Sequence, residues 1–118
     1  MKGFEQSFYC KKFFICYNNP KGCDYMQTKY MTIIFDDGPL PFMCEMVDLF
    51  NEYGFKAGFA VMGARINDDT QYMLKYAVDN GFQLVGHSHS HPRLETVTQE
   101  QVIAEMTEPV ADIKNRIG

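Results

Sequence analysis

The three histidines of this 118-residue chain all lie within the segment "GHSHSH" at positions 86–91. Imidazole changes its charge near neutral pH and is a common metal ligand, so grouping every histidine in one segment indicates a chemical role. Two adjacent carboxylates, Asp36 and Asp37, form a second polar group in "DDGP" at positions 36–39. A catalytic zinc site takes three protein ligands from His, Asp and Glu and leaves a position for water. One aspartate and two histidines meet that requirement.

The backbone conformation of each segment determines which of these side chains can bind the metal and which point elsewhere. Neighbouring residues of an extended chain point in different directions, so one aspartate can bind a metal while the other faces water as a base. If the histidine segment turns helically, His87 and His91 share a face and His89 points elsewhere. If it stays extended, all three share a face and a His-x-His pair is the ligand unit. Each segment alone also fits an ordinary turn or a solvated loop.

Alternating strand and helix patterns begin near residue 30 and place both polar groups at strand ends. Short apolar or β-branched runs predict three strands, and stretches with apolar residues on one face predict two intervening helices. The strands are predicted at 30–35, 55–61 and 82–85; the first helix follows Pro41 and ends at Gly54, and the second begins near 67–70 and ends at 80–81.

The predicted helices each have an apolar face. Thr98 and Gln101 form a capping-box signature that begins a third helix, and Pro109 is expected to kink or split it. The predicted buried faces are Met43, Met46, Val47, Phe50 and Tyr53 in the first helix; Tyr72, Met73, Tyr76 and Ala77 in the second; and Val102, Ile103, Met106, Val110, Ile113 and Ile117 in the third.

Three strand–helix repeats predict an α/β fold with a parallel sheet. Functional groups of such sheets gather at the carboxyl ends of the strands. The aspartates follow the first strand and the histidines follow the third, so both groups are predicted at the same edge of the sheet.

The composition of the chain gives no reason to expect a nucleic acid or a membrane as its partner. The net charge is −4, with 11 Lys and Arg against 15 Asp and Glu, and no basic cluster favours nucleic acid. No apolar run approaches the roughly 20 residues that span a bilayer, and the first residues do not form a convincing signal peptide. The chain is therefore predicted to be intracellular, or to lack its leader. None of the four cysteines forms Cys-x-x-Cys, so a structural zinc site is poorly supported; free thiols are expected, with a disulfide or a metal role as the alternative.

The chain is expected to comprise an N-terminal segment and one domain. Residues 1–28 are rich in aromatic side chains, contain the turn signal "NNPKG" and have no assignable role. Residues 29–118 are predicted to form the domain.

Two motifs, in order, resemble those of the polysaccharide deacetylases, the NodB homology domain of carbohydrate esterase family 4. "TIIFDDGP", Thr32 to Pro39, resembles the T-F-D-D-G-P motif, and "HSHSH" resembles H-[ST]-x-x-H. "FKAGFAVMG", "NGFQLVGHSHSHPRL" and "VTQEQVIAEM" resemble the strand, the second motif region and the downstream helix of that family. The resemblance covers roughly residues 30–118. It implies a partial (β/α) barrel of about three βα units.

The resemblance also implies residue roles. Asp36 would be the general base, and Asp37, His87 and His91 would be the ligands of a divalent metal, zinc in the first place and cobalt or nickel as alternatives. Ser88 occupies the Ser/Thr position of the motif and would support the site through a hydrogen bond. The implied activity is hydrolytic removal of acetyl groups from an N- or O-acetylated carbohydrate, such as chitin, peptidoglycan or xylan. The metal would activate the attacking water, and Asp36 would take its proton.

Several alternatives stay open. The residues up to Gly118 do not include the family's later segments, which supply an arginine that orients the base, an Asp/Trp pocket wall and a Leu-x-His acid. A half barrel with open strand edges is therefore expected, which would form a homo-oligomer or recruit a companion chain. A catalytically silent module that keeps the metal site is the second hypothesis. In the deacetylase and in the silent module alike, His89 is not a metal ligand. A His-x-His metallohydrolase of the amidohydrolase type is a weaker third hypothesis, because the aspartates precede the histidines.

Overall fold

The computed structural model describes Phe13–Phe14, Thr28–Lys29 and residues 31–118. The first two segments are the short strands β1 (Phe13–Phe14) and β2 (Thr28–Lys29), which pair antiparallel. Most of the predicted N-terminal segment lies outside the described residues, as do Tyr30 and three of the four cysteines. Cys44 is a free thiol. The boundary between a segment and a domain near residue 28 stays a prediction.

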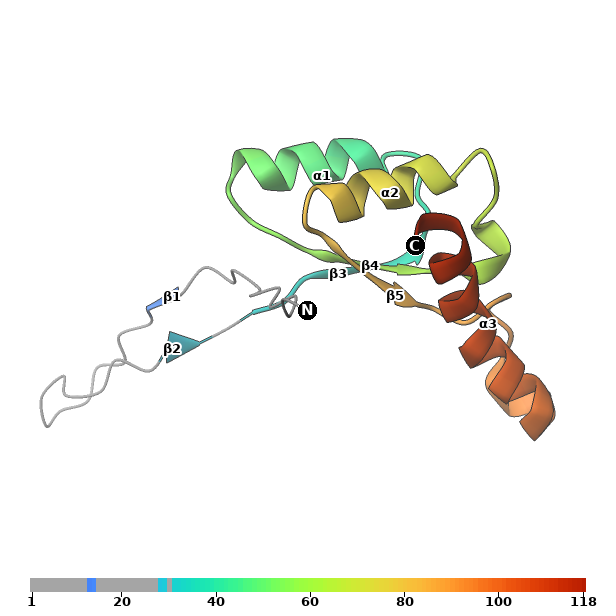
Figure 1. The fold of residues 1–118 in the computed structure, drawn as a ribbon. Helices are drawn as coiled ribbons and strands as arrows, with labels where there is room; N and C mark the ends of the chain where they lie inside the picture. The colour runs from blue at the N-terminus through green and yellow to red at the C-terminus, as the bar shows by residue number, and fades with distance from the viewer. Residues whose placement is uncertain (1–12, 15–27, 30) are drawn as a thin grey trace, which may run out of the picture.

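A parallel three-stranded sheet forms the centre of the fold (Figure 1). Its strands are β3 (Ile34–Gly38), β4 (Gly58–Val61) and β5 (Gln83–Gly86), in the order β3-β4-β5. Both pairs are parallel, which confirms the predicted α/β fold class. The first strand differs from its predicted bounds, because it begins at Ile34 and continues through both aspartates. Gly38 is still part of the sheet, since its carbonyl accepts a hydrogen bond from the backbone N–H of Met62 at 2.8 Å.

Two helices cover one face of this sheet, and a third lies against its carboxyl-end side (Figure 1). The helices α1 (Met43–Glu52) and α2 (Gln71–Asp79) lie side by side above the strands. Short 3-10 turns, η1 (Gly63–Arg65) and η2 (Leu94–Thr96), precede α2 and α3 (Gln99–Ile117).

The third helix has the predicted capping box, and of the two predicted effects of Pro109, a kink or a split, the split does not occur. Thr98 accepts a hydrogen bond from the Gln101 backbone, and the Gln101 side chain accepts one from the Thr98 backbone. Pro109 lies inside one continuous helix. A proline removes a helical hydrogen bond, but the Pro109 ring is buried. Its Cβ comes within 3.3 Å of the place where a Cβ on Gly86 would stand, so this contact joins α3 to the end of β5.

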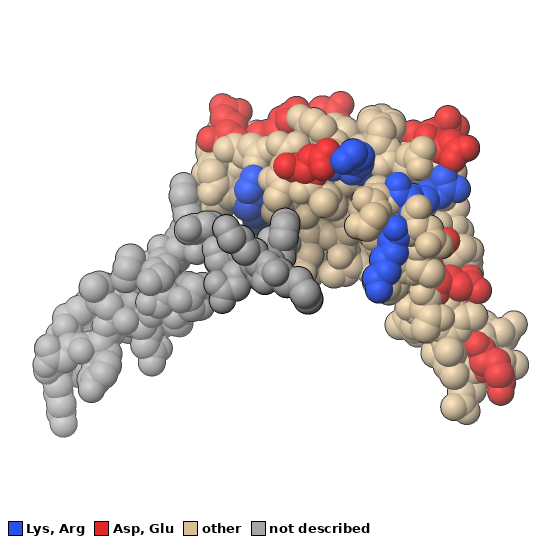
Figure 2. Space-filling view, viewed as in Figure 1, with Lys and Arg blue, Asp and Glu red and all other residues tan. Residues whose placement is uncertain are grey.

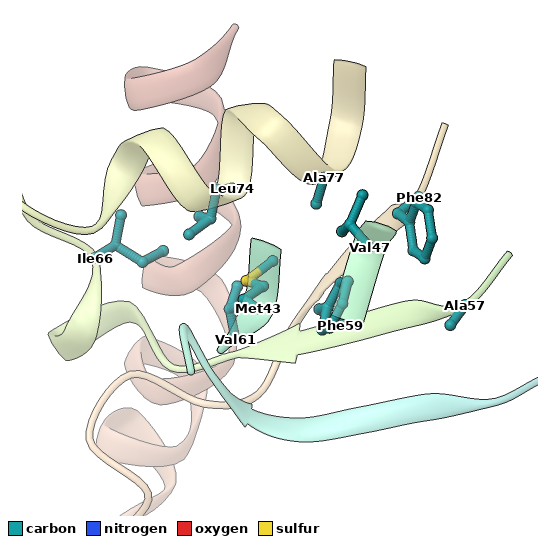
Figure 3. Packing of buried hydrophobic residues seen from close by; sticks show 9 residues of the cluster. All are labelled: Met43, Val47, Ala57, Phe59, Val61, Ile66, Leu74, Ala77 and Phe82. Atoms are coloured by element: carbon teal, nitrogen blue, oxygen red, sulfur yellow. The ribbon is translucent and has the colours of Figure 1, made fainter. Parts of the chain in front are cut away.

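The hydrophobic core lies between α1, α2 and the sheet (Figure 3). Phe59 of β4 is fully buried and stacks against Phe35 and Phe82, with ring centroids 5.7 and 5.9 Å apart. Burying a side chain of this size contributes about 1.5–3 kcal/mol. The core residues are Met43, Val47, Ala57, Phe59, Val61, Ile66, Leu74, Ala77 and Phe82.

The predicted helix faces are partly wrong. Met43, Val47 and Ala77 are buried as predicted, but Tyr53 is 61% exposed and Tyr72 is 58% exposed. Leu74, which the prediction omitted, is fully buried. Leu74 and Ala77, three residues apart, lie on the face of α2 that packs against the sheet. The predicted buried face of α2 was therefore rotated around the helix axis from the true one.

Part of α3 also remains uncovered. Ile113 and Ile117 pack against the core, whereas Ile103, Met106 and Val110 are exposed. The outer strands β3 and β5 each pair only with β4 among the described residues. The described part of the chain is therefore an open, partial barrel sheet, as predicted.

The surface carries charges of both signs. On the face shown in Figure 2, the described Lys and Arg side chains are interspersed with acidic side chains and form no continuous basic stripe. None of the described helices combines the length and the apolar composition that a membrane span requires.

Candidate metal centre

The two aspartates lie on an irregularity at the end of β3. Phe35 stands opposite Phe59 and Gly38 stands opposite Val61, so two aspartates face a single residue of β4, Ala60. An extra residue of this kind is a bulge, which re-aims side chains and is frequent beside functional sites. The second aspartate, Asp37, has a φ of 61°, in the left-handed region. Both carboxylates therefore lie where the regular alternation of side chains along β3 is interrupted.

Backbone hydrogen bonds attach the histidine loop to the residues that follow β4. The His87 N–H donates to the carbonyl of Val61 at 2.8 Å. The N–H groups of Gly63 and Ala64 donate to the carbonyls of Ser88 and His89, at 3.1 and 2.9 Å. The loop is thereby held beside η1.

This loop is neither helical nor extended. Ser88 and His91 have φ values of 57° and 59°, so two residues of this five-residue segment are in the left-handed region. The rings of His87 and His91 come together, with centroids 5.0 Å apart. His89 turns toward α3 instead, where its buried Nδ1 lies 3.5 Å from Glu108 Oε2 and 3.4 Å from Asp112 Oδ2. The histidines thus divide as the helical alternative predicts, although the backbone achieves this differently.

The loop brings two imidazoles to the carboxylate at the end of β3. Asp37 Oδ1 lies 3.4 Å from His87 Nε2 and 3.7 Å from His91 Nε2. One atom from each of the three residues lies within 4.8 Å of the others, and no other such group occurs among the described residues. These separations exceed ordinary hydrogen bonds. They are close to the about 3.4 Å that separates two ligands of a tetrahedral ion with bonds of about 2.1 Å.

The remaining predicted residues lie nearby but have different surroundings. Asp36 is exposed, and its side chain makes no hydrogen bond or ion pair with any described residue. The Ser88 hydroxyl accepts a hydrogen bond from the backbone N–H of His91 at 3.1 Å. Ser88 therefore contacts the backbone of the residue that carries one of the clustered imidazoles.

Two residues that the sequence did not indicate also hold these segments. The Arg65 guanidinium donates to the backbone carbonyl of Asp37 at 2.6 Å. The Glu105 carboxylate accepts hydrogen bonds from the backbone N–H groups of His89 and Ser90. Their partners are 15 to 28 residues away in the chain, so no local pattern could have identified them.

Comparisons with known proteins agree with this arrangement of strands and loops. A family model described as polysaccharide deacetylase matches residues 24–118. Chitin deacetylase 1 from Cryptococcus neoformans is 36% identical over 84 residues, which are 71% of this chain and 18% of that protein. The crystal structure of the Xyl-CE4 domain of a xylanase from the Trinervitermes trinervoides hindgut metagenome matches with a TM-score of 0.71 and 30% identity, covering 74% of this chain and 42% of that one.

A second solved structure is that of a family 4 acetyl xylan esterase from Clostridium thermocellum in complex with a cobalt ion. It matches with a TM-score of 0.67 and 30% identity, covering 74% of this chain and 43% of that one. The chain therefore spans less than half the length of these relatives. Since the family model covers most of the sequence and the fold agrees, the chain belongs to the polysaccharide deacetylase family.

Proposed function

We propose that this chain carries the metal centre of a hydrolase that removes acetyl groups from an N- or O-acetylated carbohydrate. The observation that carries the proposal is the convergence of Asp37, His87 and His91, whose ligand atoms lie within 4.8 Å of one another. They come from segments 50 residues or more apart in the sequence, and the parallel sheet brings those segments to one edge.

The three residues fit a divalent ion. One carboxylate oxygen and two imidazole nitrogens are a donor set that suits zinc, and this set leaves a position open for water. Cobalt and nickel accept similar ligands, and a relative of known structure was solved with cobalt. The side chains of Asp37 and His91 are 54% and 55% exposed, so an ion and a substrate can reach them. When bound, the ion would polarise the acetyl carbonyl and lower the pKa of a water molecule.

In this proposal Asp36 is the general base. Its carboxylate is exposed at the same bulge as Asp37 and is not engaged by another described side chain, so it is free to accept a proton. Ser88 supports the site through its hydrogen bond to the His91 backbone.

The substrate class follows from the relatives. Their names specify chitin, peptidoglycan N-acetylglucosamine and acetyl xylan, which share an acetyl group on a sugar. Within the described part of the chain, β3 and β5 each have one unpaired edge, and further strands can add there. We propose that further strands pair with these edges and complete the barrel around the substrate.

The test is acetate release from an acetylated chito-oligosaccharide by zinc- or cobalt-supplemented protein. Asp36→Ala should abolish turnover while retaining metal, and His91→Ala should lose both. Asp69→Ala, which removes an exposed carboxylate from the loop before α2, is the matched control and should keep the wild-type rate. Full turnover by Asp36→Ala would refute the assigned base.

A catalytically silent binding module is the second candidate. The observation that favours it is the absence of any hydrogen-bonding partner for Asp36 among the described residues, so nothing there orients the base. Stoichiometric zinc binding by the wild type without acetate release would favour this candidate.

A further inference from the structure

Glu105 on α3 connects that helix to the histidine loop. One oxygen of its carboxylate, Oε2, accepts the backbone N–H groups of His89 at 2.8 Å and Ser90 at 2.7 Å. The other oxygen, Oε1, accepts the Ser90 hydroxyl at 2.5 Å. Two successive N–H groups that converge on one oxygen form a small anion-binding concavity of the backbone. A carboxylate from a distant part of the chain occupies it here.

The loop needs such support because its backbone conformation is costly. Ser88 and His91 flank the two residues bound by Glu105, and both have positive φ values. Non-glycine residues in this region persist only where their surroundings hold them. Backbone bonds to η1 hold the first half of the loop, at Ser88 and His89. Glu105 holds its centre from the other side.

Glu105 is ionised, which strengthens its hydrogen bonds to the loop. The Ser90 hydroxyl, together with the backbone N–H groups of Ser90 and His89, holds the pKa of the Glu105 carboxyl below its usual range. The group is therefore ionised near neutral pH, and hydrogen bonds to an ionised acceptor are stronger than neutral ones.

We propose that Glu105 is a positioning residue that holds the His87–His91 loop in the conformation in which both imidazoles face Asp37. This inference rests on the proposed metal site. Glu105 makes no hydrogen bond or ion pair with either imidazole, so it acts through the loop backbone. A loop that is ordered before the ion arrives loses less conformational freedom on binding, and this raises affinity.

The test compares zinc affinity, measured by competition with a chromophoric chelator, in two variants that each remove one negative charge from α3. Glu105→Gln keeps the size of the side chain but loses the charge and one acceptor oxygen, and we expect zinc binding about 10- to 100-fold weaker. Glu100→Gln is the matched control, because the contacts of Glu100 are with its own backbone and Thr98. Its affinity should stay within about threefold of wild type, below the loss typical of a residue that orients a ligand.

Two further measurements separate positioning from general stability. The visible spectrum of the cobalt-loaded protein reports ligand geometry and should change in Glu105→Gln but not in Glu100→Gln. Amide hydrogen exchange at His89 and Ser90 should accelerate only in Glu105→Gln. If Glu105→Gln does not fold, Ser90→Ala, which removes only the hydroxyl bond, must weaken zinc binding or the inference fails.

The outcomes distinguish this inference from the function on which it rests. Zinc binding that is equal in wild type and Glu105→Gln, with an unchanged cobalt spectrum, would overturn the role of Glu105 alone. A wild type that binds no more zinc than His91→Ala would overturn the metal site, and the positioning role with it.

Discussion

A methyl group added at Gly63 tests the contact between η1 and the histidine loop. A Cβ built there would lie 2.5 Å from His89 Nδ1 and 2.8 Å from Asp112 Oδ2. Non-bonded heavy atoms pack best at about 3.5–4.0 Å, so both groups would have to move away. We therefore expect Gly63→Ala to destabilise the protein by displacing the His89 imidazole.

The magnitude depends on how freely these groups can move. The imidazole would have to retreat by roughly 1 Å to reach ordinary contact. Its backbone is fixed by the Ala64 N–H and by Glu105, whereas the Asp112 side chain is 38% exposed and can rotate away. Overpacking of this kind costs about 1–3 kcal/mol. For a domain of about 100 residues this lowers the midpoint of thermal unfolding by roughly 5–15 °C.

The assay is thermal unfolding followed by circular dichroism, with Gly58→Ala as the matched control. A Cβ at Gly58 would lie 3.4 Å from its nearest neighbour, Ile34 Cγ1, so that variant should unfold within about 1 kcal/mol of wild type. Adding His89→Ala to Gly63→Ala should recover part of the loss, as measured by a double-mutant cycle. A Gly63→Ala protein as stable as wild type, or a cycle without coupling, would refute the proposed contact.

Three further changes test other parts of the structure. Thr98→Ala removes the capping box of α3 and should lower the free energy of unfolding by about 1 kcal/mol, measured by urea denaturation. The hydrogen bond to Asp48 raises the pKa of Tyr76, so its contribution to stability is complete below about pH 10 and is lost as pH rises through the folded-state pKa. The difference in unfolding free energy between wild type and Tyr76→Phe should therefore shrink in alkali; a constant difference would contradict it. Arg65→Met frees the Asp37 carbonyl and should weaken zinc binding about tenfold in a chelator competition, whereas unchanged affinity would show that Arg65 does not position Asp37.

The sequence predicted the order of the elements because that information is local. Apolar residues at strand or helix spacing, the Gly54 and Gly81 helix ends and the Thr98 capping box each depend on neighbours within one or two turns. The same locality limited the prediction of buried faces. A rotation by one residue moves a side chain about 100° around a helix, and only the sheet beneath α2 selected Leu74 over Tyr72.

The sequence by itself also determined which residue types could form the site and that they lie toward the carboxyl ends of strands, at one edge of a parallel sheet. The tertiary structure determined the orientation of these side chains. The bulge at the aspartates and the left-handed conformations of Asp37, Ser88 and His91 are unfavourable for an isolated chain. Groups distant in the sequence hold them here: the Arg65 guanidinium bonds the carbonyl of Asp37, and the Glu105 carboxylate bonds the backbone N–H groups of the two residues between Ser88 and His91. Such support has no local signature, since folding alone brings the partners together.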